Sequence, residues 1–193
     1  NTDVAAAFTG LAQATGDDTW QTSAKAAEDF VRAMWRSECQ CFAVGTARDG
    51  QTRNLYLALD AQTWPLLAIR GGATRYAGAI APQKLRAGSG FAYGEAKQDL
   101  WTEGTAQVAL LLELLGRRKE ASDTMKALEA MRGPHGSYYA AASEQLPTGF
   151  MLETDPTQPR QYFHVEHLAA VAWVAIAQRR YNPFTKTRAL AAD

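Results

Sequence analysis

Residues that can transfer protons or bind hydroxyl groups recur at the start of apolar segments of this chain. In the segment Trp101–Gly116, Glu103 and Gln107 lie in the first turns, and the remainder is almost entirely apolar. A carboxylic acid can donate a proton, a carboxylate can accept one, and an amide can hydrogen-bond a hydroxyl group. Polar side chains at one end only therefore suggest a site at that end.

Four segments share this polar start followed by a run rich in alanine, leucine, valine and tryptophan. They span Asn1–Gly16, Leu57–Gly72, Trp101–Gly116 and His167–Asn182. Three of them end at glycine and the fourth at asparagine, the residues that favour the left-handed cap at the end of a helix. We therefore predict four buried helices.

Three further segments are apolar on one side only. Asp17–Ser37 and Arg117–Gly133 have the three-to-four spacing of an amphipathic helix. Ala73–Gly88 is weaker, because Pro82 should end or kink a helix near Ala81. Buried helices thus alternate with half-exposed ones, which predicts an all-α fold, an α/α toroid with an inner and an outer ring.

The longer connections run from each outer helix to the start of the next inner one. They cover residues 37–55, 88–100 and 133–166, and we expect all three at one mouth of the ring. The first holds an Asp49-Gly50 turn between two alternating runs, which predicts a small β-hairpin. Loops of this kind often carry function.

The register of the inner helices predicts that polar groups from four segments converge on one cavity at that mouth. These groups are Asp3, Asp60, Gln62, Glu103, Gln107 and His167. Aromatic residues gather at the same end, and rings with a polar tip suit a polyhydroxylated ligand. They are Tyr56, Trp64, Tyr93, Trp101, Tyr138, Tyr139, Tyr162 and Phe163. Carboxylates, amides, a histidine and aromatic surfaces together resemble a carbohydrate cleft.

Each of these residues also has a simpler interpretation. A carboxylate in the first turn of a helix often only caps it and interacts with the helix dipole, which would account for Asp60 or Glu103. The two glutamines could bond to the backbone, and His167 could be a helix-start histidine without a ligand. The shared register of the whole set favours a site.

Composition excludes several classes of partner. The 193 residues are 47% hydrophobic and balance 20 Lys and Arg against 20 Asp and Glu. No basic surface for nucleic acid or for a membrane is therefore expected. The apolar runs are too short to span a bilayer. We predict one domain over residues 1–193.

The two cysteines, Cys39 and Cys41, lie in an alternating run. Alternate residues of a strand point the same way, which is poor geometry for a bridge, so we predict free thiols. A metal site would need further ligands that the neighbouring sequence does not supply. We predict no metal and no cofactor.

The order of six stretches resembles the C-terminal part of bacterial glycosidase-like proteins that have a six-hairpin (α/α)6 toroid and are linked to exopolysaccharide. The stretches are ATGDDTW, FAVGTARDG, LALDAQTWPLLAI, WTEGTAQVALLLELLGR, TGF and HLAAVAWVAIAQRRYNPF; LDAQTW, EGTAQ and NPF are the most specific pieces. About seven helices supply about half of such a ring. Similar proteins also carry a glutamate and a histidine before the asparagine that corresponds to Asn1. The resemblance therefore implies that upstream sequence or a second polypeptide completes the toroid.

The resemblance implies acid/base hydrolysis of a polysaccharide or oligosaccharide, such as a glucan or exopolysaccharide. Glu103, next to Trp101 and an apolar helix, is the candidate acid because burial raises a carboxyl pKa. Asp60 is the candidate base, and an inverting mechanism would leave room for a water molecule between the two carboxyl groups. The predicted substrate-binding residues are Asp3, Gln62, Trp64, Trp101, Gln107, Tyr138 and His167.

Other functions stay open. A non-catalytic glycan-binding or assembly subunit would keep the aromatic cleft and use its carboxylates as hydrogen-bond acceptors. A polysaccharide lyase or a sugar epimerase is less favoured, since a lyase on an acidic polymer would want a positive cleft and a tyrosine or histidine base. A polysaccharide substrate favours the periplasm or the cell exterior over the cytoplasm.

Overall fold

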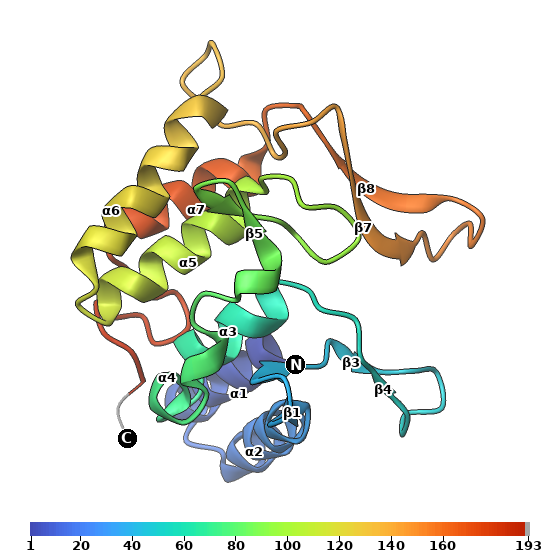
Figure 1. Cartoon of the computed structure of the whole chain (residues 1–193). Helices are drawn as coiled ribbons and strands as arrows, with labels where there is room; N and C mark the ends of the chain where they lie inside the picture. Colours follow the sequence, from blue (N-terminus) through green and yellow to red (C-terminus); the bar gives the residue numbers. More distant parts are fainter. Residues whose placement is uncertain (192–193) are drawn as a thin grey trace.

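The four apolar segments each form a helix, and each of these helices packs beside the next one along the chain (Figure 1). The computed structural model describes residues 1–191. The helices are α1 (Thr2–Thr15), α3 (Asp60–Ala68), α5 (Thr102–Leu114) and α7 (Leu168–Gln178). α1 contacts α3, α3 contacts α5, and α5 contacts α7. The prediction of four helices is confirmed, and α3 and α5 are mostly buried. The prediction that all four are buried is wrong for α1, which buries only Thr2 and Ala5, and for α7, which buries only Ala170, Val174 and Ala177.

Two of the three amphipathic helices are also confirmed. α2 (Asp18–Ala33) packs against α1, and α6 (Arg118–Ala127) packs against α5 and continues into the 3-10 turn η3 (Leu128–Met131). Asp17 caps α2 by accepting a hydrogen bond from the Thr19 N–H at 2.9 Å. Each apolar helix of these pairs thus forms a helical hairpin with the amphipathic helix that follows it.

The third amphipathic helix, predicted over residues 73–88, is wrong. The chain forms only α4 (Gly72–Arg75) and the 3-10 turns η1 (Ala77–Ala79) and η2 (Gln83–Leu85). Gly71 adopts a left-handed conformation with φ of 64° before α4. Gly78 lies so close to Gln40 that an added Cβ would be 2.4 Å from the Gln40 Cβ. Tight approach and a glycine-rich sequence therefore replace a continuous helix with short turns.

The all-α prediction is wrong as well, because the chain is 46% helical and 18% strand. Its connections pair into four two-stranded antiparallel sheets. The strands are β1 (Trp35–Arg36), β2 (Cys41–Phe42), β3 (Gly45–Thr46), β4 (Arg53–Asn54), β5 (Arg86–Ala87), β6 (Gly90–Phe91), β7 (Gln145–Met151) and β8 (Pro159–Phe163). The backbone N–H and C=O groups of these connections form hydrogen bonds across the hairpins. Helices alone therefore do not describe the architecture. The chain is a mixed α and β structure.

Two of the hairpins extend from the helices on the same side of the molecule (Figure 1). The β3–β4 hairpin is the one predicted from the Asp49-Gly50 turn, and the carboxylate of Asp49 accepts hydrogen bonds from the N–H groups of Gln51 and Thr52 at 2.9 and 2.8 Å. The longer β7–β8 hairpin pairs Gln145 with Phe163 and has an irregular register between Pro147 and Met151. Its length explains most of the strand content that the sequence analysis missed.

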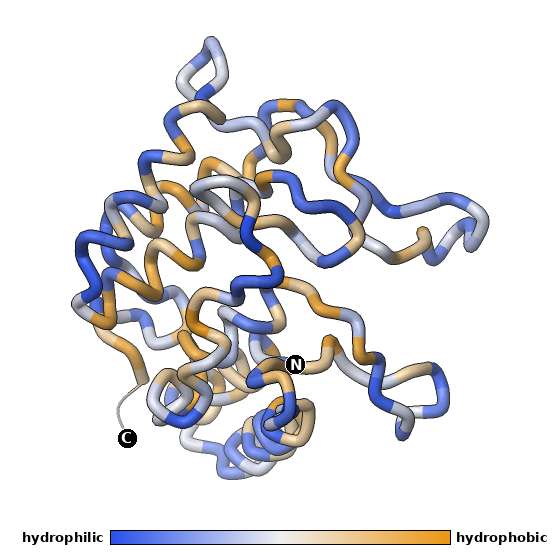
Figure 2. Tube along the Cα trace, in the orientation of Figure 1, coloured by the Kyte–Doolittle hydropathy of each residue, from blue (hydrophilic) through white to orange (hydrophobic). Residues whose placement is uncertain are grey.

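The core is built around α5, which is buried at every position from Thr102 to Leu112. Leu59, Leu66 and Leu110 are among its fully buried side chains, and each contributes about 1.5–3 kcal/mol by leaving water. Hydrophilic residues are concentrated along α6 and at the β3–β4 turn (Figure 2). Within the described residues, no helix combines the length and the apolar character needed to cross a membrane.

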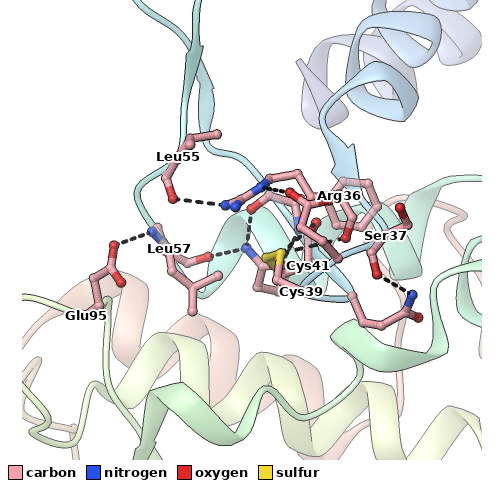
Figure 3. The surroundings of a disulfide bond; sticks show 12 residues. Arg36, Ser37, Cys39, Cys41, Leu55, Leu57 and Glu95 are labelled. Atoms are coloured by element: carbon pink, nitrogen blue, oxygen red, sulfur yellow. Dashed lines mark hydrogen bonds and ion pairs between the residues drawn. A yellow bond between two sulfur atoms is a disulfide. The ribbon is translucent and has the colours of Figure 1, made fainter.

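Cys39 and Cys41 form a disulfide, so the prediction of free thiols is wrong (Figure 3). The prediction assumed one continuous strand, whereas β1 ends at Arg36 and β2 begins at Cys41. Gln40 lies between the cysteines in a left-handed conformation with φ of 52°, and the two Cα atoms are 5.2 Å apart. A turn at this point therefore brings together two thiols that a strand would keep apart.

Candidate functional site

The starts of α3 and α5 are held together by backbone hydrogen bonds to the connection that joins them. The Leu59 N–H donates to the Tyr93 carbonyl and the Trp101 N–H to the Phe91 carbonyl, both at 2.8 Å. In the first turn of α5, an added Cβ at Gly104 would lie 2.5 Å from Leu59 Cδ2. Glycine thus allows the two helix starts to approach closely, and their first turns carry Asp60 and Glu103.

Asp60 lines a cavity of about 440 Å³. Asp3, Asn54, Trp64, Tyr93, Phe150 and Arg160 are among the other lining residues. One oxygen of Asp60, Oδ1, accepts a hydrogen bond from the Ala61 N–H at 2.8 Å. Burial raises the pKa of Asp60, and the Ala61 N–H, its own N–H and the charge of Arg160 offset part of that rise. Asp60 therefore lines a space of ligand size, with its Oδ1 held by the first turn of α3.

Glu103 lines a neighbouring depression of about 390 Å³ together with Arg160, Tyr162 and His167. Only 8% of the residue is exposed. Burial, and then the negative charge of Asp60, raise the pKa of Glu103 to about 7. Two carboxyl groups with separate environments thus lie near enough for the charge of one to raise the pKa of the other, and Glu103 holds its proton up to about pH 7.

His167 precedes α7 and lies beside Glu103. Its Nδ1 is 3.2 Å from Glu103 Oε1. The two atoms are not aligned as a hydrogen bond, and each is buried without a hydrogen-bond partner among the described residues. The two side chains are therefore in close contact without a hydrogen bond between them.

Aromatic rings connect the two depressions. Tyr162 of β8 packs against Trp101 and Tyr93, with ring centroids 5.4 and 5.6 Å apart. Burial raises the pKa of both tyrosine hydroxyls, and the nearby charges of Glu103 and Asp60 raise it further. Both phenols therefore stay neutral and able to donate hydrogen bonds across the physiological pH range.

Arg160 is the residue that the sequence analysis missed. It lies on β8 and lines both the Asp60 cavity and the Glu103 depression. Tyr93 and Tyr162 were noted among the aromatic residues but not as site residues. Arg160 and Tyr162 are two positions apart, and alternate residues of a strand share a face. That spacing was the available signal, but it required recognition of β8 as a strand.

Gln62, a predicted substrate-binding residue, lines neither the Asp60 cavity nor the Glu103 depression. The side chain is fully buried. Its oxygen accepts from the Phe42 N–H at 2.7 Å, and its nitrogen donates to the carbonyls of Phe42 and Ala58 at 3.0 Å. The Gln62 amide therefore holds β2 against α3 through hydrogen bonds to the backbone, the alternative to a sugar contact.

Gln107, Trp101 and Tyr138 are also buried away from a ligand surface. The Gln107 oxygen accepts from the Thr63 hydroxyl at 2.7 Å, and the residue is fully buried. Trp101 is 2% exposed and lies beneath other rings. The Tyr138 oxygen accepts from Arg132 at 2.9 Å, with 5% of the residue exposed. The structure thus brings Asp3, Asp60, Trp64, Glu103 and His167 to the two depressions and leaves these three residues in the interior.

Comparisons with known proteins find no matching family model and no similar curated protein. The functional interpretation therefore depends on the geometry of the site. Among the residues that the structure describes, no group of three or more His, Cys, Asp or Glu side chains is placed to hold a metal ion.

Proposed function

We propose that this protein hydrolyses glycosidic bonds of a polysaccharide or oligosaccharide, with Glu103 as the general acid and Asp60 as the general base. The observation that carries the proposal is the raised pKa of Glu103, about 7, beside the charge of Asp60. Glycoside hydrolysis uses two carboxyl groups of which one is protonated and the other ionised. Burial and mutual repulsion provide that difference here.

In the proposed reaction, Glu103 donates its proton to the leaving glycosidic oxygen as the bond to the anomeric carbon breaks. Asp60 accepts a proton from a water molecule, whose oxygen forms the new bond to that carbon. A hydrogen bond from His167 to Glu103 would then stabilise the carboxylate that remains. Proton release from Asp60 and proton uptake by Glu103 restore the starting state.

The surroundings of the two carboxyl groups suit a sugar. The neutral hydroxyls of Tyr93 and Tyr162 can hydrogen-bond sugar hydroxyls, and the partly exposed ring of Trp64 can pack against a sugar face. A cavity of about 440 Å³ falls within the range of small-molecule sites. The stacking role is therefore proposed for Trp64 and not for Trp101, which is buried against other rings.

The test is release of reducing ends from a panel of α- and β-linked glucans and a bacterial exopolysaccharide. We expect release by the parent protein and a loss of about 100- to 10 000-fold in Glu103→Gln and Asp60→Asn, the range typical of general acid–base catalysis. Glu166→Gln is the matched control, because this glutamate also lies beside a histidine but outside the site. Circular dichroism establishes that each variant folds.

Two outcomes would contradict hydrolysis. Unchanged release in Glu103→Gln would remove the proposed acid. Binding of glycans without release by the parent would instead support a glycan-binding protein. One observation favours that second candidate: Asp60 and Glu103 line two adjoining depressions that share Arg160.

A further inference from the structure

Arg160 lines the site but has no role in the proposed reaction. Of the described residues that line the Asp60 cavity, it is the only lysine, arginine or histidine. It also lines the Glu103 depression. A sugar chain that contacts both carboxyl groups would therefore pass this side chain.

The guanidinium of Arg160 makes no hydrogen bond or ion pair with the described residues. Its backbone carbonyl accepts from the Thr148 hydroxyl at 2.9 Å, which fixes the main chain of β8 against β7. Other arginines are used differently: Arg117 donates two bonds to the carboxylate of Glu120, at 2.7 Å each. The main chain of Arg160 is thus held in place, while its planar donors stay available.

Charge determines which ligand suits this donor. A neutral sugar that covered Arg160 would displace water from a cation without neutralising it, which is unfavourable. A carboxylate can accept two parallel hydrogen bonds from a guanidinium and compensates its charge. Two carboxyl groups, those of Asp3 and Asp60, line the cavity with Arg160, but neither hydrogen-bonds its guanidinium, and Asp60 Oδ1 already accepts from the Ala61 N–H.

We propose that the substrate is an acidic glycan and that Arg160 binds the carboxylate of a uronic acid unit beside the scissile bond. This inference rests on the proposed function for the reaction, but binding alone can test it. Arg160 is therefore a specificity-determining residue, and the two carboxyl groups act on a bond whose neighbouring sugar it positions.

The experiment measures binding by calorimetry in the Glu103→Gln background, where ligands are not consumed. The probes are matched pairs of tetrasaccharides: β-1,4-linked glucose against β-1,4-linked glucuronic acid, and β-1,4-linked mannose against β-1,4-linked mannuronic acid. We expect at least one acidic member to bind about 10- to 100-fold more tightly than its neutral partner, the effect of a charge-assisted contact.

Variants at Arg160 test whether this residue causes the preference for acidic tetrasaccharides. Arg160→Gln should remove it, and Arg160→Lys should retain only part, because lysine lacks the two-pronged geometry. Arg48→Gln is the matched control: Arg48 is exposed in the β3–β4 turn, and its substitution changes the net charge equally. It should leave the preference unchanged. Circular dichroism and urea unfolding test whether the variants stay folded.

Three results would overturn the inference: equal affinity within each pair, an acid preference that survives in Arg160→Gln, or no binding by any of the four oligosaccharides. Its failure is distinguishable from failure of the proposed function. Hydrolysis of neutral glycans with no effect of Arg160→Gln would remove the inference alone. Acid-selective binding that depends on Arg160, without hydrolysis by the parent, would remove the catalytic proposal alone.

Discussion

Two glutamate–histidine pairs in this protein have similar N–O distances, but the pKa values of their glutamates are shifted in opposite directions. His167 Nδ1 is 3.2 Å from Glu103, and His135 Nδ1 is 3.0 Å from Glu166. The side chains of the first pair are 39% and 11% exposed, whereas His135 is 81% exposed. The pKa of Glu103 is raised by burial and by Asp60, whereas the Ser137 hydroxyl and His135 lower that of Glu166.

A contact between a carboxylate and a histidine therefore does not by itself define a catalytic pair. Glu166 receives hydrogen bonds from the His135 ring and backbone, which stabilise its charged form. Glu103 has no aligned hydrogen bond at Oε1 and lies in the interior beside a second carboxyl group. Burial without compensation raises the pKa of Glu103, whereas solvation and hydrogen bonds lower that of Glu166.

The largest expected effect that separates the two pairs is on the pH dependence of hydrolysis. Because the acid must be protonated, kcat/KM should fall about tenfold for each pH unit above about 7. Toward low pH it should fall as Asp60 gains a proton. Glu166→Gln should leave both limbs unchanged. A rate that stays level from pH 7 to pH 9 on a hydrolysed glycan would show that Glu103 is not the titrating acid.

The second prediction concerns stability. The pKa of Glu103 rises from 4.5 to about 7 on folding, so the folded protein binds more protons than the unfolded chain between these values. The stabilising contribution is complete below about pH 4.5 and is lost as pH rises through about 7, a loss of ~3 kcal/mol. Glu103→Gln should remove this loss and be more stable than the parent at pH 8.

Urea unfolding of the oxidised protein from pH 4.5 to pH 8 measures this effect. Glu166 is the control, because folding shifts its pKa in the opposite direction. Its pKa is lowered in the fold, so its contribution is present at neutral pH and is lost as pH falls through the acid range. Glu166→Gln should therefore leave the loss between pH 4.5 and 7 unchanged. Parallel curves for the parent and Glu103→Gln would contradict the burial of an ionisable Glu103.

The third prediction compares two buried glutamines. Gln62 makes three hydrogen bonds to the backbone, whereas the amide nitrogen of Gln107 has no partner among the described residues. Gln62→Leu leaves buried backbone groups unsatisfied and should lower the free energy of unfolding by about 3 kcal/mol. Gln107→Leu should cost about 1 kcal/mol or less, since it also removes an unsatisfied donor. Equal losses in urea unfolding would contradict this distinction.

These glutamines also mark the limit of what the sequence could predict. Helix-period patterns were enough to predict α1, α3, α5 and α7, because such signals are local. The predicted ends hold at Gly16 and Gly116, whereas α3 ends at Ala68 before Gly72 and α7 ends at Gln178 before Asn182. The role of Gln62 depends on β2, which lies twenty positions earlier in the chain and has only two residues. A contact of this kind leaves no periodic signal.

The candidate site also contains residues that local patterns predict and residues that depend on distant contacts. Asp60 and Glu103 were predictable because their helices supply the register. Arg160 was not, because it comes into place through pairing of Leu146 with Tyr162 in a hairpin with an irregular register. The disulfide was missed because it needs a left-handed residue, Gln40, between the cysteines. Long-range pairing and exceptional backbone conformations account for the errors.

The smallest expected effect is on the exposed pair itself. His135→Ala should leave the urea midpoint at pH 7 unchanged within experimental error, because an exposed ion pair is weak and both partners are well solvated without it. The pKa of Glu166 should rise toward its ordinary value but stay below it, since the Ser137 hydroxyl remains. Carboxyl NMR titration of Glu166 measures that rise. A marked loss of stability would mean that the 133–137 loop depends on this pair, and solvent exposure would then not separate it from Glu103 and His167.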